Sequence, residues 1–239
     1  MPIYWLDDEQ IAFPHHQHAN EYGILAAGGD LSIERIIFAY QHGIFPWYNE
    51  GEPILWWSPD PRFVLFPDQL KIAKSMRSYF NQGKFAYSFD TAFADVIANC
   101  KVTDRKGQGG LSWITPEMQA AYIQLHELGF AHSIEVWEKG NLVGGLYGIA
   151  MGKVFFGESM FTEVSNASKF GFISLVNHLI PQGFELIDCQ QETKHLASLG
   201  AEAIPRVDFL KLLSTLIKSP KPSGRWDYPK DQIGNNHFP

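Results

Sequence analysis

The chain lacks most features of secreted and membrane-spanning proteins. It has only two cysteines, Cys100 and Cys189, which are too few for the disulfide framework of a small secreted protein. No run of about 20 apolar residues occurs, so we expect no membrane span. The first ten residues, MPIYWLDDEQ, have neither the basic nor the apolar region of a signal peptide. We therefore expect a protein of the reducing cytoplasm.

Positive charge is also scarce. Lys and Arg number 19 against 26 Asp and Glu, which gives a formal net charge of −7. This balance argues against binding of nucleic acid by the whole surface, so any RNA contact requires a local basic patch. The same acidity suits a basic partner. A length of 239 residues allows two modest domains, and we predict a small one over residues 1–64 and a larger one over residues 65–239.

Predicted strands and helices alternate irregularly, which favours an α+β or mixed-sheet fold over a doubly wound one. Capping residues precede three predicted helices: Ser32, Asp90 and Thr115. Apolar spacing predicts a further helix over residues 68–82 and strands over residues 85–89 and 131–137. No repeat or low-complexity block interrupts this pattern.

Residues 142–190 form the most informative stretch, a predicted unit of two strands, a helix and a third strand. Three glycines within residues 142–150 indicate a bulge or a close approach of the backbone. The helix begins after Ser165 and Asn166, and a short strand covers residues 184–187. Glu158 and Asp188 then stand at the ends of strands that we expect to be neighbours. A polar group at the end of a buried strand must find a partner or take part in chemistry.

Taken without further context, these residues allow plainer explanations. Glu158 and Asp188 could form a buried ion pair with Lys169 or Arg206. Cys189 is predicted to point away from the side that Asp188 and Gln190 share, as a buried structural cysteine would, and not to act as a nucleophile with His195.

Other clusters are equally open to two interpretations. Trp47, Trp56 and Trp57 lie among prolines and could form either a pocket wall or an interdomain core. A basic helix face formed by Lys71, Lys74 and Arg77 could contact phosphates or simply face solvent, and the loop of residues 101–112 could do the same. His15, His16 and His18 have no nearby Cys or carboxylate at a known ligand spacing, so we predict no metal site there.

Three blocks in order carry a specific resemblance: GESMF at residues 157–161, NASK at 166–169 and LIDCQ at 186–190. Together they resemble the bacterial leucyl/phenylalanyl-tRNA–protein transferase family. Further blocks agree with it: LAAGGDL (25–31), GIFPW (43–47), WWSPDPR (56–62), HSIEVW (132–137) and HLASLGA (195–201). The resemblance runs from about residue 11 to about residue 210.

The resemblance implies an acetyltransferase-like (GNAT-like) mixed-sheet C-terminal domain with a small N-terminal α/β domain. The loop that holds the pyrophosphate of CoA in acetyltransferases is missing between Glu158 and Lys169, so we do not predict acetyl-CoA. No cofactor is implied, because aminoacyl-tRNA is itself the donor substrate. The implied reaction moves Leu or Phe, less often Met, to the α-amino group of proteins that begin with Arg or Lys, which marks them for N-end-rule degradation. We expect a monomer.

Such a reaction requires positioning, proton removal and oxyanion stabilisation, but no enzyme nucleophile. Asp188 is the first choice for the group that accepts the proton or orients the amine. Gln190 is assigned to hydrogen bonding of the amine, because an amide is a very poor base. Glu158 is assigned to binding the donor ammonium or the cationic acceptor.

The resemblance also implies an apolar slot for the donor side chain and a surface for tRNA. The residues of the slot are Trp47, Trp113, Leu146, Phe155, Leu175 and Leu179. Lys71, Lys74 and Arg77 are the predicted tRNA contacts. Two rival functions remain: an N-acyltransferase that uses acyl-CoA or builds on a cell-wall precursor, and a non-catalytic module that binds RNA or protein N-termini.

Overall fold

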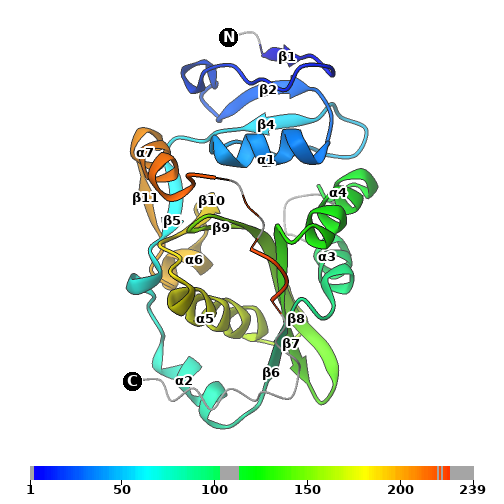
Figure 1. The fold of residues 1–239 in the computed structure, drawn as a ribbon. Helices are drawn as coiled ribbons and strands as arrows, with labels where there is room; N and C mark the ends of the chain where they lie inside the picture. Colours follow the sequence, from blue (N-terminus) through cyan, green and yellow to red (C-terminus); the bar gives the residue numbers. More distant parts are fainter. Residues whose placement is uncertain (1–2, 103–112, 220, 222, 227–239) are drawn as a thin grey trace.

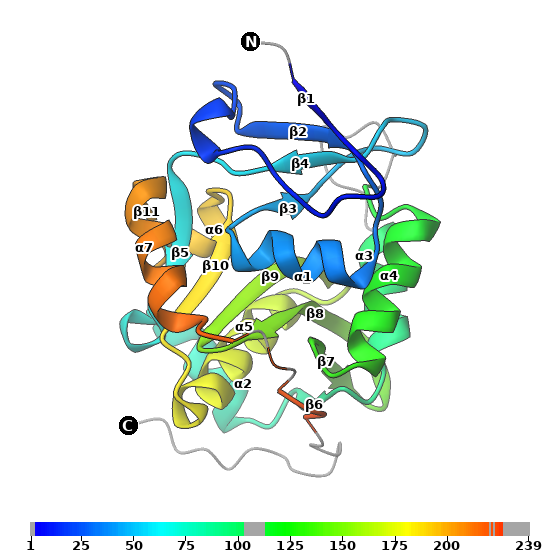
Figure 2. The ribbon, with the colours of Figure 1, turned by 45° about the horizontal axis from the view of Figure 1, so that its top comes forward.

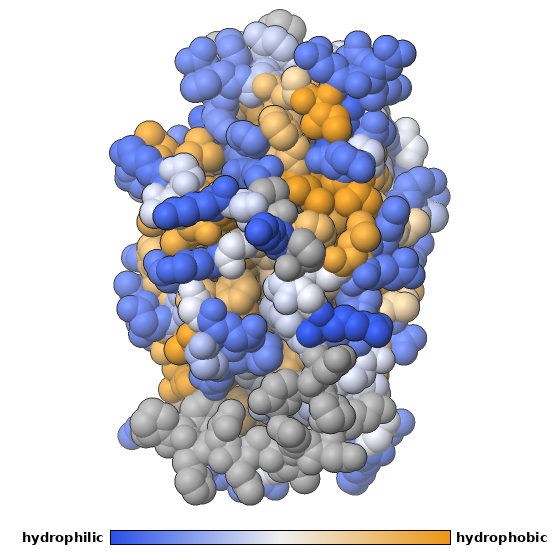
Figure 3. Space-filling view, viewed as in Figure 1, coloured by the Kyte–Doolittle hydropathy of each residue, from blue (hydrophilic) through white to orange (hydrophobic). Residues whose placement is uncertain are grey.

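The computed structural model describes residues 3–102, 113–219, 221 and 223–226 of the chain. This part contains a four-stranded sheet and a seven-stranded sheet, one above the other in Figure 1. Apolar residues reach the surface between hydrophilic ones near the level where the two layers meet (Figure 3). No helix of the described ranges is long and apolar enough to cross a membrane.

The N-terminal layer is a small sheet with one helix on its inner side. Its strand order is β1 (Tyr4–Leu6), β2 (Ile24–Gly28), β4 (Leu55–Trp57) and β3 (Phe45–Pro46). Helix α1 (Ile33–Gln41) lies between this sheet and the larger one (Figures 1 and 2). The Ser32 side chain accepts a hydrogen bond from the Arg35 N–H and caps α1, as predicted. A short 3-10 helix, η1 (His16–His18), precedes β2.

The larger sheet carries the C-terminal domain. Its strand order is β11 (Glu202–Ile204), β5 (Arg62–Leu65), β10 (Leu186–Gln190), β9 (Val154–Thr162), β8 (Asn141–Met151), β7 (Ala131–Glu138) and β6 (Ala86–Phe89). Only β9 and β10 pair in parallel, and every other pairing of this sheet is antiparallel. This mixed sheet confirms the predicted α+β class. Because β5 spans residue 64, the chain passes from one sheet to the other between Trp57 and Arg62.

Each face of the larger sheet has its own apolar core. One core joins the sheet to α1, α3 (Phe93–Val102), α4 (Pro116–Glu127) and α7 (Arg206–Leu216). The other joins it to α2 (Lys74–Asn81), α5 (Ala167–Leu179) and α6 (Lys194–Ser198). Two further 3-10 helices complete the described elements: η2 (Pro67–Gln69) and η3 (Ile180–Gln182). Helices therefore cover both faces of the larger sheet.

The glycines of β8 confirm both predictions made for them. A Cβ atom on Gly148 would lie 2.1 Å from the Phe156 carbonyl oxygen, and the register with β9 shifts between Tyr147 and Gly148. A Cβ atom on Gly144 would lie 2.7 Å from the Ala167 Cβ, so its absence allows the first turn of α5 to pack on the sheet.

Several local predictions are wrong, for different reasons. The strand predicted over residues 184–187 is β10, Leu186–Gln190, so Asp188 lies inside the strand and not at its end. The helix predicted over residues 68–82 begins only at Lys74, because the Lys71 N–H pairs with the Leu199 carbonyl, 2.9 Å away, rather than within a helix. Asp90 does not cap α3, because its carboxylate accepts hydrogen bonds from the backbone N–H groups of Ser133 and Trp226. Glu158 lies inside β9 instead of at its end, since pairing with β8 continues to Thr162.

Candidate active site

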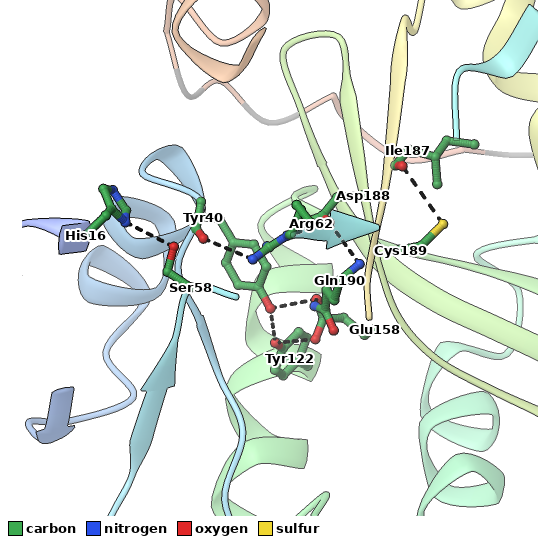
Figure 4. A network of polar contacts seen from close by, with 11 residues as sticks. His16, Tyr40, Ser58, Arg62, Tyr122, Glu158, Ile187, Asp188, Cys189 and Gln190 are labelled. Carbon is green, nitrogen blue, oxygen red and sulfur yellow. Dashed lines mark hydrogen bonds and ion pairs between the residues drawn. The ribbon is translucent and has the colours of Figure 1, made fainter. Parts of the chain in front are cut away.

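The site lies where the parallel strands β9 and β10 diverge. Their shared register ends at Phe156 and Asp188. Beyond this point β9 stays paired with β8, whereas β10 shows a register shift and Gln190 has a φ of 61°. The divergence leaves Glu158 and Gln190 free to meet side chains from the N-terminal layer and from α4 (Figure 4).

Asp188 forms a two-point ion pair with Arg62 of β5. The Arg62 Nε donates to Asp188 Oδ1 at 2.8 Å, and Nη2 donates to Oδ2 at 2.6 Å. Asp188 is 0% and Arg62 1% exposed. Arg62 also donates to the Gly43 carbonyl and lies over the Phe45 and Phe209 rings. The alternative of a buried ion pair with Lys169 or Arg206 named the wrong partners for Asp188, whose partner is Arg62.

Arg206 makes different contacts, which explains the error. Its Nη1 donates to the Ser58 carbonyl at 2.5 Å, and its Nη2 lies 4.0 Å from Asp60 Oδ2. Arg206 therefore ties α7 to the segment between the two sheets. Arg62 is adjacent to Asp188 only through the pairing of β5 with β10, which local sequence patterns do not reveal.

Glu158 is surrounded by neutral donors instead of a cation. Tyr40 donates to its Oε1 at 2.6 Å, Tyr122 to its Oε2 at 2.9 Å, and the Gln190 side-chain amide to its Oε1 at 3.0 Å (Figure 4). The two tyrosine hydroxyls lie 2.5 Å apart. The three donors come from α1, α4 and β10, so Glu158 joins both domains.

This environment changes the acidity of the groups. Burial raises the pKa of Glu158 to about 7, and the nearby Asp188 carboxylate adds to the rise, while the tyrosine hydrogen bonds and Arg62 oppose it. Burial, followed by the charge of Glu158, raises the pKa of both Tyr40 and Tyr122 well above its usual value. The tyrosines are therefore neutral donors at physiological pH, and Glu158 is the group able to change its charge.

The sequence predicts that Gln190 lies on the same side of the strand as Asp188, but its side chain takes a different direction. Its backbone N–H donates to Asp188 Oδ1 at 2.9 Å, while its side chain reaches Glu158. The register shift and the left-handed φ at Gln190 interrupt the alternation on which the prediction depended. All three predicted catalytic residues nevertheless line one cavity.

The cavity beside these residues has a volume of about 440 Å³ and a wall that is mainly apolar. Four of the six residues predicted for the donor slot line it: Trp47, Trp113, Leu146 and Phe155. Leu175 and Leu179 do not line it. They are 1% and 0% exposed in the core beneath α5. Lining residues that the sequence did not indicate include Phe45, Met160, Phe172, Ile187, His195 and Leu196.

The sequence of this chain matches known protein families over most of its length. The family model described as leucyl/phenylalanyl-tRNA protein transferase matches residues 64–214, and the model of that family's N-terminal domain matches residues 29–60. The chain belongs to the leucyl/phenylalanyl-tRNA protein transferase family. It is therefore an aminoacyltransferase.

Curated relatives in this transferase family extend over nearly the same length. A leucyl/phenylalanyl-tRNA–protein transferase of Stutzerimonas stutzeri is 52% identical over 218 residues, covering 90% of this chain and 96% of the relative. One from Myxococcus xanthus is 52% identical over 227 residues, covering 95% and 97%. One from Nitratidesulfovibrio vulgaris is 50% identical over 233 residues, covering 98% and 99%.

Solved structures similar to this transferase share little sequence with it. A GCN5-related N-acetyltransferase from Kribbella flavida is 11% identical, with a TM-score of 0.36, covering 69% of this chain and 58% of that one. The L-PGS structure from Bacillus licheniformis is 12% identical, with a TM-score of 0.39, covering 65% and 49%. Both are too distant to say anything about a substrate.

Cys189 and His195, which also line the transferase cavity, do not have the properties of an activated thiol nucleophile and its base. Burial raises the pKa of the Cys189 thiol far above its usual value, and the Asp188 charge adds to this rise. A thiol that stays protonated is a weak nucleophile. Burial, together with Lys169, lowers the pKa of His195. Its Nε2 is buried without a hydrogen-bond partner among the described residues.

The predicted tRNA contacts of the transferase lie on one exposed segment. Lys74 and Arg77 belong to α2, and Lys71 precedes that helix by three residues. All three side chains are exposed. Most of the basic loop, residues 103–112, lies outside the described residues. Within the described ranges, no group of three or more His, Cys, Asp or Glu side chains is arranged to hold a metal ion.

Proposed function

We propose that this transferase moves Leu or Phe, and less often Met, from aminoacyl-tRNA to the α-amino group of proteins that begin with Arg or Lys. The modified proteins are thereby marked for N-end-rule degradation in the cytoplasm, and the enzyme acts as a monomer. One observation carries the proposal. A mainly apolar cavity of about 440 Å³ is bordered by two carboxylates, of which one is paired with an arginine and the other is hydrogen-bonded by neutral donors. Cavities of this size suit a small substrate group.

The apolar wall takes the donor side chain, and the carboxylate end takes the cationic acceptor. Trp47, Trp113, Leu146 and Phe155 offer only apolar surface and indole to a Leu, Phe or Met side chain. The formal charge of −7 favours approach of an acceptor with a cationic first residue. Leu175 and Leu179 support the wall from within the core instead of touching the donor.

The reaction exchanges an ester for an amide. The acceptor nitrogen attacks the ester carbonyl of the aminoacyl-tRNA, a C–N bond forms and the ester C–O bond breaks. The acceptor ammonium first loses one proton, which frees its lone pair, and the nitrogen loses a second proton when the amide forms. The departing ribose oxygen gains one proton. An α-amine has a pKa near 8, so only roughly a tenth is neutral at pH 7. A group that removes the proton at the right position therefore speeds the reaction.

The environments favour Glu158 over Asp188 as the proton acceptor. Both oxygens of Asp188 are held by the Arg62 guanidinium, and the pair is fully buried. Both carboxylates border the cavity, but Glu158 is held by neutral donors, and its pKa of about 7 is close to physiological pH. Glu158 thus binds the acceptor ammonium and receives its proton, while Asp188 and Gln190 hold Glu158 and the amine in place.

The exposed face of Lys71, Lys74 and Arg77 binds the phosphates of tRNA. This proposal is supported by the exposure of the three side chains and by the three-residue spacing of Lys74 and Arg77, which places those two on one face of α2; Lys71 lies just before the helix. The overall charge of the chain is negative, so a local cationic surface is required for RNA.

The decisive experiment uses purified protein, tRNA charged with labelled Leu or Phe, and two peptides that differ only in beginning with Arg or Ala. We expect label on the Arg peptide alone, and no label after ribonuclease treatment. No transfer from protein shown to be folded would overturn the proposal. Transfer that persists with ribonuclease and requires acyl-CoA would support the rival N-acyltransferase, and binding without transfer would support the non-catalytic module.

A further inference from the structure

Residues 223–226 form a short segment, far along the chain, that docks on the same side of the larger sheet as α5. The Ser223 Oγ lies 2.7 Å from His132 Nε2, and the Ser223 N–H donates to the Gly129 carbonyl at 3.0 Å. The Trp226 N–H donates to Asp90 Oδ2 at 2.8 Å. Asp90 in turn holds His132 Nδ1 at 2.8 Å. These contacts fix both ends of the segment.

The Trp226 side chain belongs to the apolar core beneath α5 and is only 5% exposed. Its ring stacks on His132, with the centroids 4.0 Å apart and the planes 9° from parallel. It meets the Phe89 ring edge-on at 5.9 Å and the His178 ring of α5 at 5.0 Å. Its Nε1 is buried with no partner in the described part of the chain. The indole therefore contributes shape to this core, not a side-chain hydrogen bond.

One neighbour of Trp226 connects this core to the cavity. The Phe155 ring centroid lies 6.0 Å from that of Trp226, and Phe155 lines the cavity. On another side, a Cβ atom added to Gly148 would lie 2.6 Å from the Phe155 Cζ. The Phe155 ring thus packs close to the backbone of β8 at Gly148 and also meets the Trp226 ring of the C-terminal segment.

We infer that Trp226 is a positioning residue that fixes Phe155 and so sets the depth of the slot for the donor side chain. The inference rests on the proposed aminoacyl-tRNA reaction. Apolar slots discriminate between similar side chains by about 10- to 200-fold, and this discrimination depends on how closely the wall fits. Removing the support lets Phe155 move back. The enlarged slot then fits Leu less well, while the larger Phe side chain still fills it.

The test uses the full chain, a saturating Arg peptide and two minimal donors, leucyl-adenosine and phenylalanyl-adenosine, so that tRNA contacts do not contribute. For Trp226→Ala we expect KM for the Leu donor to rise about tenfold and the Phe/Leu ratio of kcat/KM to rise about threefold or more. Trp226→Phe, which keeps an aromatic ring, should restore most of the parent ratio. Trp5→Ala removes an indole that is 71% exposed, and it is the matched control.

A second experiment separates positioning from a general loss of structure. Each variant is assayed at a temperature where its circular dichroism shows it folded, and Trp226→Leu is used if Trp226→Ala is not folded at any assay temperature. The double variant Trp226→Ala/Phe155→Leu is compared with the two single variants. If Trp226 acts through Phe155, the change in the logarithm of the Phe/Leu ratio of kcat/KM will be smaller in the double variant than the sum of the two single changes.

An unchanged donor ratio in the folded Trp226 variant would overturn the inference. So would a fall in kcat that is equal for both donors, because a merely structural role predicts that pattern. Full additivity with Phe155→Leu would also contradict it. A folded parent protein that transfers neither amino acid to any peptide would instead overturn the proposed function, and this inference with it.

Discussion

Glu158 and Asp188 belong to neighbouring strands, but their surroundings are opposite. Asp188 is completely buried, and the Arg62 guanidinium donates to both of its oxygens. Glu158, which borders the same cavity as Asp188, receives hydrogen bonds from two hydroxyls and an amide, all neutral. Arg62 engages both oxygens of Asp188, whereas Glu158 is held by neutral donors and burial raises its pKa to about 7. From this comparison we propose a positioning role for the region around Asp188 and a proton-handling role for Glu158.

Replacing Glu158 with Gln is expected to have the largest effect on rate. The amide keeps the shape of the side chain but cannot take the proton, so kcat/KM should fall about 10²- to 10⁴-fold. Single-turnover transfer of labelled Leu to the Arg peptide measures the change. Glu163→Gln, at an exposed position just beyond β9, is the matched control. A Glu158→Gln rate within twofold of the parent would remove Glu158 from the proton transfer.

Replacing Arg62 with Met should have the largest effect on stability. The change leaves the Asp188 carboxylate buried without its partner, which typically costs about 3–5 kcal/mol in the free energy of unfolding. Urea unfolding at pH 7 measures the loss. The double variant with Asp188→Leu should regain much of it, because an apolar pair can replace a buried ion pair. An unchanged urea midpoint in the single variant would show that the pair does not hold the strands together.

Replacing Asp188 with Asn should lower the rate less than the Glu158 change. Asp188 acts on the reaction through Arg62 and Gln190, so the loss is one of positioning, about 10²-fold or less. The measurement is kcat on the Arg peptide with the fold checked by circular dichroism. Full activity would favour the non-catalytic interpretation of this residue, and a loss greater than that of Glu158→Gln would reverse the assigned roles.

Changing Lys71, Lys74 and Arg77 together to Glu should weaken tRNA use without changing the chemistry. We expect the slope of log affinity against log salt to become shallower by about 2 to 3, at roughly 0.7 to 0.9 per lost phosphate contact. Turnover of a minimal leucyl-adenosine donor should stay the same.

The control for this experiment makes the same change of net charge on other exposed lysines: Lys139, Lys211 and Lys218. Equal weakening by both triple variants would show that total charge, not this face, attracts tRNA. Equal loss with tRNA and with the minimal donor would show that the variant damages the active site itself.

Local sequence signals predicted the elements that depend on local contacts. Ser32 and Thr115 cap their helices as expected, because each hydroxyl accepts from a backbone N–H three residues on. Gly148 marks a bulge in β8, and the neighbouring strands bring Glu158 and Asp188 together as expected. The family resemblance placed four residues on the cavity wall that composition and spacing alone would assign to the core.

Contacts between distant segments were the part that the sequence did not reveal. Tyr40 and Tyr122 are 82 residues apart, and they meet at Glu158 only because α1 and α4 pack on the same face of the larger sheet. Arg62 reaches Asp188 across 126 residues of sequence. Leu175 and Leu179 have the same spacing as residues that line a cavity, yet α5 turns them into the core. No spacing rule distinguishes these outcomes.

The pH dependence of the Tyr122→Phe variant tests the division between the two carboxylates most directly. Glu158 must be ionised to accept a proton, so with a pKa of about 7 the parent rate rises as pH passes through neutrality. The Tyr122 hydrogen bond lowers the pKa of Glu158, so its removal raises that pKa further. The same Arg peptide is used for both proteins, so the ionisation of its amine cancels in the ratio of their rates. We predict a loss of rate that is larger at pH 6 than at pH 8. A loss that is constant from pH 6 to pH 8 would contradict the account.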